Sequence, residues 1–193
     1  MTDGKRTVGL LGGSFNPAHD GHVHISQLAM KRLGLDELWW LVSPQNPLKS
    51  TDGMASLSER LKTAKSVASV DERIAVKDIE SRLGTRYTVD TLAALKAENP
   101  NLAFVWIIGA DNLRQFPKWK GWKRIFRTVP IAVFPRAPYS LRARNGRAAR
   151  CFEDAKIPAR QAHRLSRMMP PAWAFLKAPL NGQSATRIRG LKD

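Results

Sequence analysis

Short apolar runs alternate with segments of helical periodicity along most of this chain, and this alternation restricts the fold more than any other feature. Apolar runs of strand length lie at residues 6–13, 37–44, 73–78, 102–108, 129–136 and 172–178. Apolar residues recur at helical spacing near 21–33, 56–69, 88–100 and 119–126. Strands that alternate with helices favour parallel strands joined by crossover helices. The pattern therefore predicts an α/β, Rossmann-like, doubly wound and mainly parallel sheet with helices on both faces.

Residues that start and stop helices support these boundaries. Gly34 follows the first helical segment, where glycine suits a C-cap. Ser56 or Ser58 is available to cap the second segment, and Thr88 is expected to cap the third. The run at 102–108 is apolar throughout, which predicts the most buried strand of the sheet.

The length and composition fit a single folded domain over residues 1–193, with 43% hydrophobic residues. Cys151 is the only cysteine, which excludes an internal disulfide framework and favours a cytoplasmic location. No apolar run approaches the roughly 20 residues of a membrane-spanning helix, so no membrane partner is expected. The apolar stretch near the N-terminus is too short for a secretion signal. Residues 137–170 are irregular and basic, and they fit either a mobile loop or an inserted helical segment.

Positive charge is concentrated in one part of the chain. Residues 1–112 hold 13 Lys and Arg against 13 Asp and Glu, whereas residues 113–167 hold 15 against 2. A local basic block favours an anionic partner. Nucleic acid, anionic lipid and phosphorylated small molecules all fit that description.

The first apolar run ends in a glycine-rich turn, within GLLGGSFNPAHDGH at residues 9–22. The turn lacks the G-x-G-x-x-G and G-x-x-x-x-G-K-[ST] patterns of common nucleotide-binding loops. Gly12 and Gly13 nevertheless allow the backbone to approach a ligand closely, and Ser14 adds a hydroxyl. Backbone N–H groups of such a turn and of the next helix bind phosphate oxygens. The turn lies at the carboxyl end of its strand, where ligands bind in open α/β sheets.

Two histidines at the start of the following helix are the strongest chemical signal. His19 and His22 are three residues apart and share one helix face, with Gly21 between them. Together they predict contacts to a phosphorylated ligand, although ordinary structural histidines are an alternative. A metal site that includes Asp20 and His24 is a second alternative. His24 is disfavoured as a partner because it points elsewhere on a helix.

A second anion-binding element is predicted near the C-terminus, in NGQSATRIRG. Ser184 and Thr186 precede or open an expected last helix within 184–192, which carries Arg187 and Arg189. Hydroxyls, helix N–H groups and a guanidinium together suit a ligand with several phosphates.

These segments resemble those of a known family. GGSFNPAHDGH is similar to the G-G-S-F-D-P-x-H-x-G-H signature of bacterial nicotinate-nucleotide adenylyltransferases, within the HxGH nucleotidyltransferase superfamily. Further resemblance follows in the family's order at NPLK, TRYTVDTL, IGADNLRQFPKW and SATRIR, so that it spans about residues 7–189. The chain departs from the family pattern at Asn16, Leu48, Arg86, Gln183 and Ala185.

The resemblance implies a reaction of NAD biosynthesis, in which nicotinate mononucleotide and ATP give deamido-NAD and pyrophosphate. The acceptor's own phosphate attacks the α-phosphorus of ATP, so the protein needs no nucleophile. The implied catalytic residues are His19, His22 and Arg189. The implied ATP-binding residues are Gly12, Gly13, Ser14, Phe15, His19, Gly21, His22, Gly109, Asp111, Ser184, Thr186 and Arg189. Those implied for nicotinate mononucleotide are Asn16, Lys49, Thr85, Tyr87, Thr88, Trp119 and Arg136.

The same resemblance implies Mg²⁺ bound mainly through the ATP phosphates, with no metal site made by the protein. Asp111 is expected to contact ribose hydroxyls, with a helix N-cap as the alternative role. Trp119 is expected to cover the nicotinate ring, with simple packing of Trp119 and Trp122 against the core as the alternative. Backbone N–H groups near Thr88 are expected to favour the acid over the amide acceptor.

Two rival functions remain. One is a related HxGH nucleotidyltransferase that acts on another phosphorylated acceptor. The other is a nucleic-acid-binding protein, which the basic block and the six tryptophans support. The sequence makes no prediction of oligomeric state.

Overall fold

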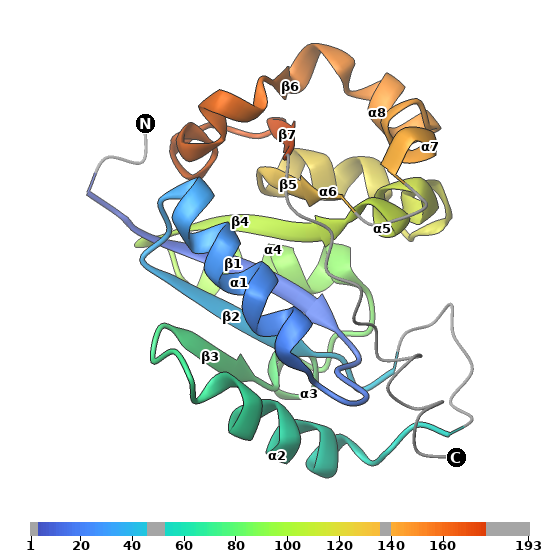
Figure 1. Cartoon of the computed structure of the whole chain (residues 1–193). Coiled ribbons are helices and arrows are strands. Elements are labelled where there is room, and N and C mark those ends of the chain that lie inside the picture. Colours follow the sequence, from blue (N-terminus) through green and yellow to red (C-terminus); the bar gives the residue numbers. More distant parts are fainter. Residues whose placement is uncertain (1–3, 46–52, 136–139, 177–193) are drawn as a thin grey trace.

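The computed structural model describes residues 4–45, 53–135 and 140–176. Its strands form one seven-stranded sheet in the order β3-β2-β1-β4-β5-β7-β6, parallel at every pairing (Figure 1). The strands are β1 (Arg6–Gly13), β2 (Glu37–Val42), β3 (Ile74–Lys77), β4 (Leu102–Gly109), β5 (Ile131–Phe134), β6 (Lys156–Ile157) and β7 (Trp173–Phe175). The predicted Rossmann-like α/β fold is confirmed.

Helices cover both faces of this sheet. The α-helices are α1 (Asp20–Leu33), α2 (Leu57–Ala68), α3 (Ile79–Leu83), α4 (Thr88–Glu98), α5 (Ala110–Gln115), α6 (Trp122–Thr128), α7 (Ser140–Arg144) and α8 (Arg147–Cys151). The 3-10 helices are η1 (Phe116–Lys118), η2 (Glu153–Ala155) and η3 (Ala159–Arg167). One face packs against α1, α2 and η3, and the other against α3, α4, α5, α6 and α8. Among the described helices, none combines the length and apolar character needed to cross a membrane.

Strand β4 lies at the centre of the sheet and is buried on both faces. Every residue in 103–108 is buried, the longest such run in the described strands, as predicted. Successive side chains alternate between the two faces: Phe104 and Trp106 join one core cluster, and Val105 and Ile107 join the other. This rigid centre fixes the positions of the loops that follow β1 and β4.

The helix ends confirm two predicted caps and correct a third. Gly34 ends α1 with φ 63°, a left-handed conformation that favours glycine. Ser56, rather than Ser58, caps α2, and its hydroxyl accepts from the Glu59 N–H. The prediction for Thr88 was wrong: Tyr87 is the N-cap of α4, without a side-chain hydrogen bond, and Thr88 is already helical.

The irregular segment before β7 is mostly helical. Within residues 140–170 the chain forms α7, α8 and η2, then the short strand β6, and then η3. Strand β6 pairs with β7 and extends the sheet by one strand that the sequence did not predict. The predicted strand near 172–178 is confirmed as β7. The last helix predicted within 184–192 lies outside the described residues.

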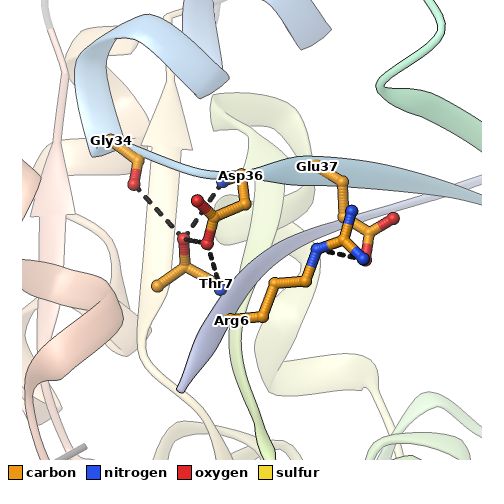
Figure 2. Close-up of polar contacts among 5 residues, drawn as sticks. All are labelled: Arg6, Thr7, Gly34, Asp36 and Glu37. Carbon is orange, nitrogen blue, oxygen red and sulfur yellow. Dashed lines mark hydrogen bonds and ion pairs between the residues drawn. The ribbon is translucent and has the colours of Figure 1, made fainter. Parts of the chain in front are cut away.

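A polar cluster joins β1 to the turn before β2 at the amino edge of the sheet (Figure 2). The Thr7 N–H and hydroxyl donate to Asp36 Oδ2 over 2.6 and 2.8 Å. The Thr7 hydroxyl also lies 3.3 Å from the Gly34 carbonyl oxygen, and Arg6 pairs with Glu37 at 3.6 Å. The donations from the Thr7 N–H and hydroxyl hold the pKa of the Asp36 carboxyl below its ordinary range. This cluster lies at the edge opposite the glycine-rich turn.

Candidate active site

The strand order reverses direction between β1 and β4, and this point defines the candidate site. From β1 the chain crosses to β2 through α1 on one face, whereas from β4 it crosses to β5 through α5 and α6 on the other. Leu11 pairs with Ile107, so β1 and β4 end side by side. In open α/β sheets, ligands bind beyond the carboxyl ends of the strands at such a reversal.

The turn after β1 is built around a buried phenylalanine. Phe15 has φ 47° and is 2% exposed. Its ring stacks on Trp40, with centroids 5.0 Å apart, and lies 4.7 Å from the ring of His22. Because the side chain of Phe15 is buried, only its backbone is left to contact a ligand at this edge.

Gly12 and Gly13, which are the last two residues of β1 rather than part of the turn, also have a packing role. A Cβ on Gly12 would lie 2.5 Å from the Trp106 ring, and a Cβ on Gly13 would lie 3.3 Å from the Phe15 ring. At 2.5 Å a Cβ at position 12 would overlap the Trp106 ring, so only glycine fits there. The end of β1 therefore depends on glycine because large aromatic rings lie beneath it.

His19 and His22 cap their own helix. His19 is the N-cap of α1, and its Nδ1 accepts from the Gly21 N–H over 3.1 Å. His22 Nδ1 accepts from the His19 N–H over 3.2 Å, and the ring centroids lie 4.0 Å apart. When Nδ1 of a neutral imidazole accepts, Nε2 carries the proton. Both histidines are thus set as Nε2–H donors, whereas His24 is exposed on the same helix.

The loop after β4 brings a carboxylate to the same edge. Gly109 ends β4 and is the N-cap of α5, and Asp111 lies in the first turn of that helix. The alternative role of Asp111 as the N-cap is therefore wrong. Asp111 is half-buried, and its Oδ1 is shielded from solvent. Its placement beside the ends of β1 and β4 suits contact with a ligand bound there.

The residues predicted for the nicotinate ring pack against the face that carries α4 and α6. Tyr87 and Trp119 both lie half-buried against that core. Trp119 is 4.9 Å from Phe116 between ring centroids, and its Nε1 is buried without a hydrogen-bond partner among the described residues. The Thr85 and Thr91 hydroxyls are 2.8 Å apart, so Thr85 braces the first turn of α4.

Comparison with known proteins agrees with this geometry. The family model described as cytidylyltransferase-like matches residues 10–191. A probable nicotinate-nucleotide adenylyltransferase of Parvibaculum lavamentivorans is 57% identical over 189 residues, which cover 98% of this chain and 93% of the relative. The corresponding protein of a Ruegeria species is 49% identical over 183 residues, with 95% and 96% covered. The chain belongs to the nicotinate-nucleotide adenylyltransferase family.

The fold is shared with a more distant solved structure of similar name. A Plasmodium falciparum nicotinic acid mononucleotide adenylyltransferase complexed with NaAD superposes with a TM-score of 0.71 at 16% identity. The match covers 96% of this chain and 83% of that one. At this identity the likeness concerns the arrangement of strands and helices alone.

Part of the predicted site lies outside the described residues, namely Lys49, Arg136, Ser184, Thr186 and Arg189. The described part brings His19 and His22 together and places Gly109 and Asp111 at the same edge of the sheet. Tyr87 and Trp119 both pack against the core cluster on the α4 and α6 side, and Thr85 contacts Thr91 of α4.

Asn16, a departure from the family's usual aspartate, has a local partner. Its Nδ2 donates to the Gly53 carbonyl, and its Oδ1 accepts from the Ala55 N–H, each over 3.2 Å. An aspartate could accept the second of these bonds but could not donate the first. The amide therefore ties the glycine-rich turn to the segment that leads into α2.

Sequence reasoning missed two polar residues beside this turn. Arg60 is 2% exposed, although it lies on α2 at the same helical face as Ala64 and Ala68. A charged residue within an apolar stripe was the signal that could have identified it. Glu80 accepts from the Ser43 hydroxyl over 2.7 Å, and burial raises the pKa of its carboxyl.

Proposed function

We propose that this protein transfers the adenylyl group of ATP to nicotinate mononucleotide, a step of NAD biosynthesis. An oxygen of the acceptor phosphate attacks the α-phosphorus of ATP in line. The bond from that phosphorus to the bridging oxygen breaks, and pyrophosphate leaves. The observation that carries the proposal is that Nδ1 of both His19 and His22 accepts a backbone N–H at the carboxyl edge of the sheet, which leaves each Nε2 to donate. Membership of the nicotinate-nucleotide adenylyltransferase family supports the same reaction.

The roles of the site residues follow from charge. Two anionic substrates must approach each other, and negative charge grows on the leaving pyrophosphate. His19 and His22 donate to the α-phosphate and bridging oxygens, aided by backbone N–H groups from Gly12 to Phe15 and at Gly21. Ser184, Thr186 and Arg189 hold the β- and γ-phosphates. Lys49 and Arg136 hold the acceptor phosphate.

The remaining contacts select the two nucleosides. Gly109 lets the backbone meet the adenosine, and Asp111 accepts from its ribose hydroxyls. Trp119 covers the nicotinate ring of the acceptor, while Thr85, Tyr87, Thr88 and Asn16 lie around it. Because α4 has no side-chain cap at Tyr87, the N–H groups of its first turn suit a carboxylate.

Magnesium fits this donor set as a companion of ATP. Within residues 4–45, 53–135 and 140–176, no three His, Cys, Asp or Glu side chains stand together as metal ligands. Such a site suits Mg²⁺ that is bound mainly by phosphate oxygens and water. When bound, the ion neutralises part of the phosphate charge. We also assign the enzyme to the cytoplasm, because its one cysteine fits a reducing compartment.

The test is a product assay with matched acceptors. Purified protein is incubated with ATP, Mg²⁺ and either nicotinate mononucleotide, its amide form or another phosphorylated acceptor. Pyrophosphate release and the mass of the dinucleotide are measured. We expect deamido-NAD, with kcat/KM for the acid exceeding that for the amide by roughly 5- to 150-fold, because a mismatched donor pair costs about 1–3 kcal/mol. Absence of deamido-NAD would refute the function, and a ratio near one would refute only the acid preference.

A further inference from the structure

The guanidinium of Arg60 is buried among backbone carbonyls from three separate segments. Its Nη1 donates to the carbonyl oxygens of Ser14 and Ser43, each over 2.7 Å. Its Nη2 donates to Pro44 over 2.9 Å, and its Nε to Ala55 over 3.0 Å. The acceptors thus come from the turn after β1, the loop after β2 and the lead-in to α2.

Only an arginine can make this set of contacts. Its planar fork presents five N–H donors in fixed directions, whereas a lysine ammonium is a single point charge. A buried charge is costly unless it is well hydrogen-bonded, so four carbonyl acceptors at 2.7–3.0 Å compensate its loss of water. Asp78 adds an opposite charge nearby.

The joined segments include the one that carries the paired histidines. Ser14 lies in the turn that leads into His19, and the Ser43 N–H donates to the Gly13 carbonyl over 2.9 Å. Asn16 supplies a second link between the same turn and the lead-in to α2. The turn after β1 is therefore held by hydrogen bonds from Arg60 and Asn16 to neighbouring segments.

We propose that Arg60 is a positioning residue for adenylyl transfer: it fixes the turn after β1 against the loop after β2. The histidine donors then keep a set position at the carboxyl edge of the sheet. This inference rests on the proposed function. We call the four hydrogen bonds of Arg60 the Arg60 clamp. Small misplacements of reacting groups can cost about 100-fold in rate. Loss of the clamp should therefore lower kcat more than it changes KM.

The test replaces Arg60 with lysine and separates kcat from KM in the pyrophosphate assay with ATP and nicotinate mononucleotide. We expect kcat per folded molecule to fall about 10- to 100-fold while each KM changes less than about threefold. The matched control is Arg73→Lys, because Arg73 pairs with Asp71 just before β3, at the other edge of the sheet. That control should keep wild-type kcat. Circular dichroism and thermal unfolding quantify the folded fraction.

Several outcomes would overturn the assignment. Unchanged kcat in folded Arg60→Lys would do so, as would a loss explained entirely by unfolded protein. Should Arg60→Lys not fold, Arg60→Gln, which keeps an uncharged amide donor, takes its place: reduced kcat with little-changed KM values supports the positioning role, and unchanged kcat overturns it. Wild-type protein that releases no pyrophosphate would overturn the proposed function itself, whereas a loss confined to Arg60→Lys would leave that function standing.

Discussion

The two histidines at the start of α1 serve the fold and the chemistry through different atoms. Each Nδ1 accepts a backbone N–H of the helix start, over 3.1 and 3.2 Å. These caps fix the tautomer of each ring before any substrate arrives. Preorganised donors of this kind stabilise developing charge without reorganisation during the reaction.

Replacing His22 with alanine should therefore reduce turnover strongly in a folded protein. Loss of one preorganised donor costs roughly 10²- to 10³-fold in kcat, and loss of the capping contact costs about 1 kcal/mol of stability. Steady-state kinetics and thermal unfolding measure the two effects. His24→Ala on the same helix is the control and should be nearly silent. Normal turnover in His22→Ala would contradict the phosphate-contact role.

Asp36 gives the stability a defined dependence on pH. Its folded pKa is depressed, so its stabilising effect is present above its ordinary value of 3.8 and is lost as pH falls through the folded value. We expect Asp36→Asn to lower the free energy of unfolding by about 1 kcal/mol at pH 7, since the group is exposed. Urea denaturation should show that the difference in unfolding free energy between the wild type and Asp36→Asn is smaller at acid pH than at pH 7. A difference that persists in acid would contradict this account.

At the scale of the element, α2 depends on a single well-placed cap. The Ser56 hydroxyl accepts from the Glu59 N–H, while Glu59 Oε2 accepts from the Ser56 N–H over 3.0 Å. Ser56→Ala should cost about 1 kcal/mol of unfolding free energy, as measured by urea denaturation. Ser58→Ala on the same helix should change it by less than about 0.5 kcal/mol. Equal effects of the two substitutions would refute the assignment of the cap.

The sequence predicted long elements well and short ones poorly. β1, α1 and β4 have clear periodicity or continuous apolar runs, and their boundaries fall within a residue or two of expectation. The two-residue strand β6 and the five-residue helices α3 and α8 are too short to show a period. The N-cap of α4 was misplaced by one residue because Thr88 resembles a cap locally, whereas the chain turns helical directly after Tyr87.

In the candidate site, the sequence predicted residues that are close together in the chain and missed contacts between distant segments. His19, His22 and the glycine-rich turn were visible because they are adjacent in sequence. The contact of Arg60 with Ser14, and those of Asn16 with Gly53 and Ala55, join residues more than 30 positions apart. Such pairings arise only when β1 and β2 lie side by side, so no local pattern predicts them.

At the scale of the whole molecule, the described part of the basic block, residues 113–135 and 140–167, exposes many cations and no tryptophan. Exposed cations lie on α6, α8 and η3, for example Arg124, Arg150 and Arg164. None of the six tryptophans falls among the exposed residues, although proteins that bind single strands stack bases on accessible aromatic rings. The block instead favours a raised local concentration of anionic substrates.

DNA binding should consequently be weak and sensitive to salt. We expect affinity for single- or double-stranded DNA to fall steeply between low and physiological ionic strength, without sequence preference. Fluorescence anisotropy with labelled oligonucleotides across a salt series measures this. Submicromolar, sequence-selective binding at physiological salt would favour the rival function of a nucleic-acid-binding protein.

The Arg60 clamp restricts the amino acid at position 60 much more than the amino acids at the positions that it contacts. All four of its acceptors are main-chain oxygens, and every amino acid supplies such an oxygen. Side chains at positions 14, 43, 44 and 55 are therefore free to vary as far as this contact is concerned, provided that the backbone path is kept. Position 60 has no equivalent freedom. In a saturation mutagenesis library, position 60 should be intolerant, whereas positions 44 and 55, which meet the guanidinium only through main-chain oxygens, should be permissive.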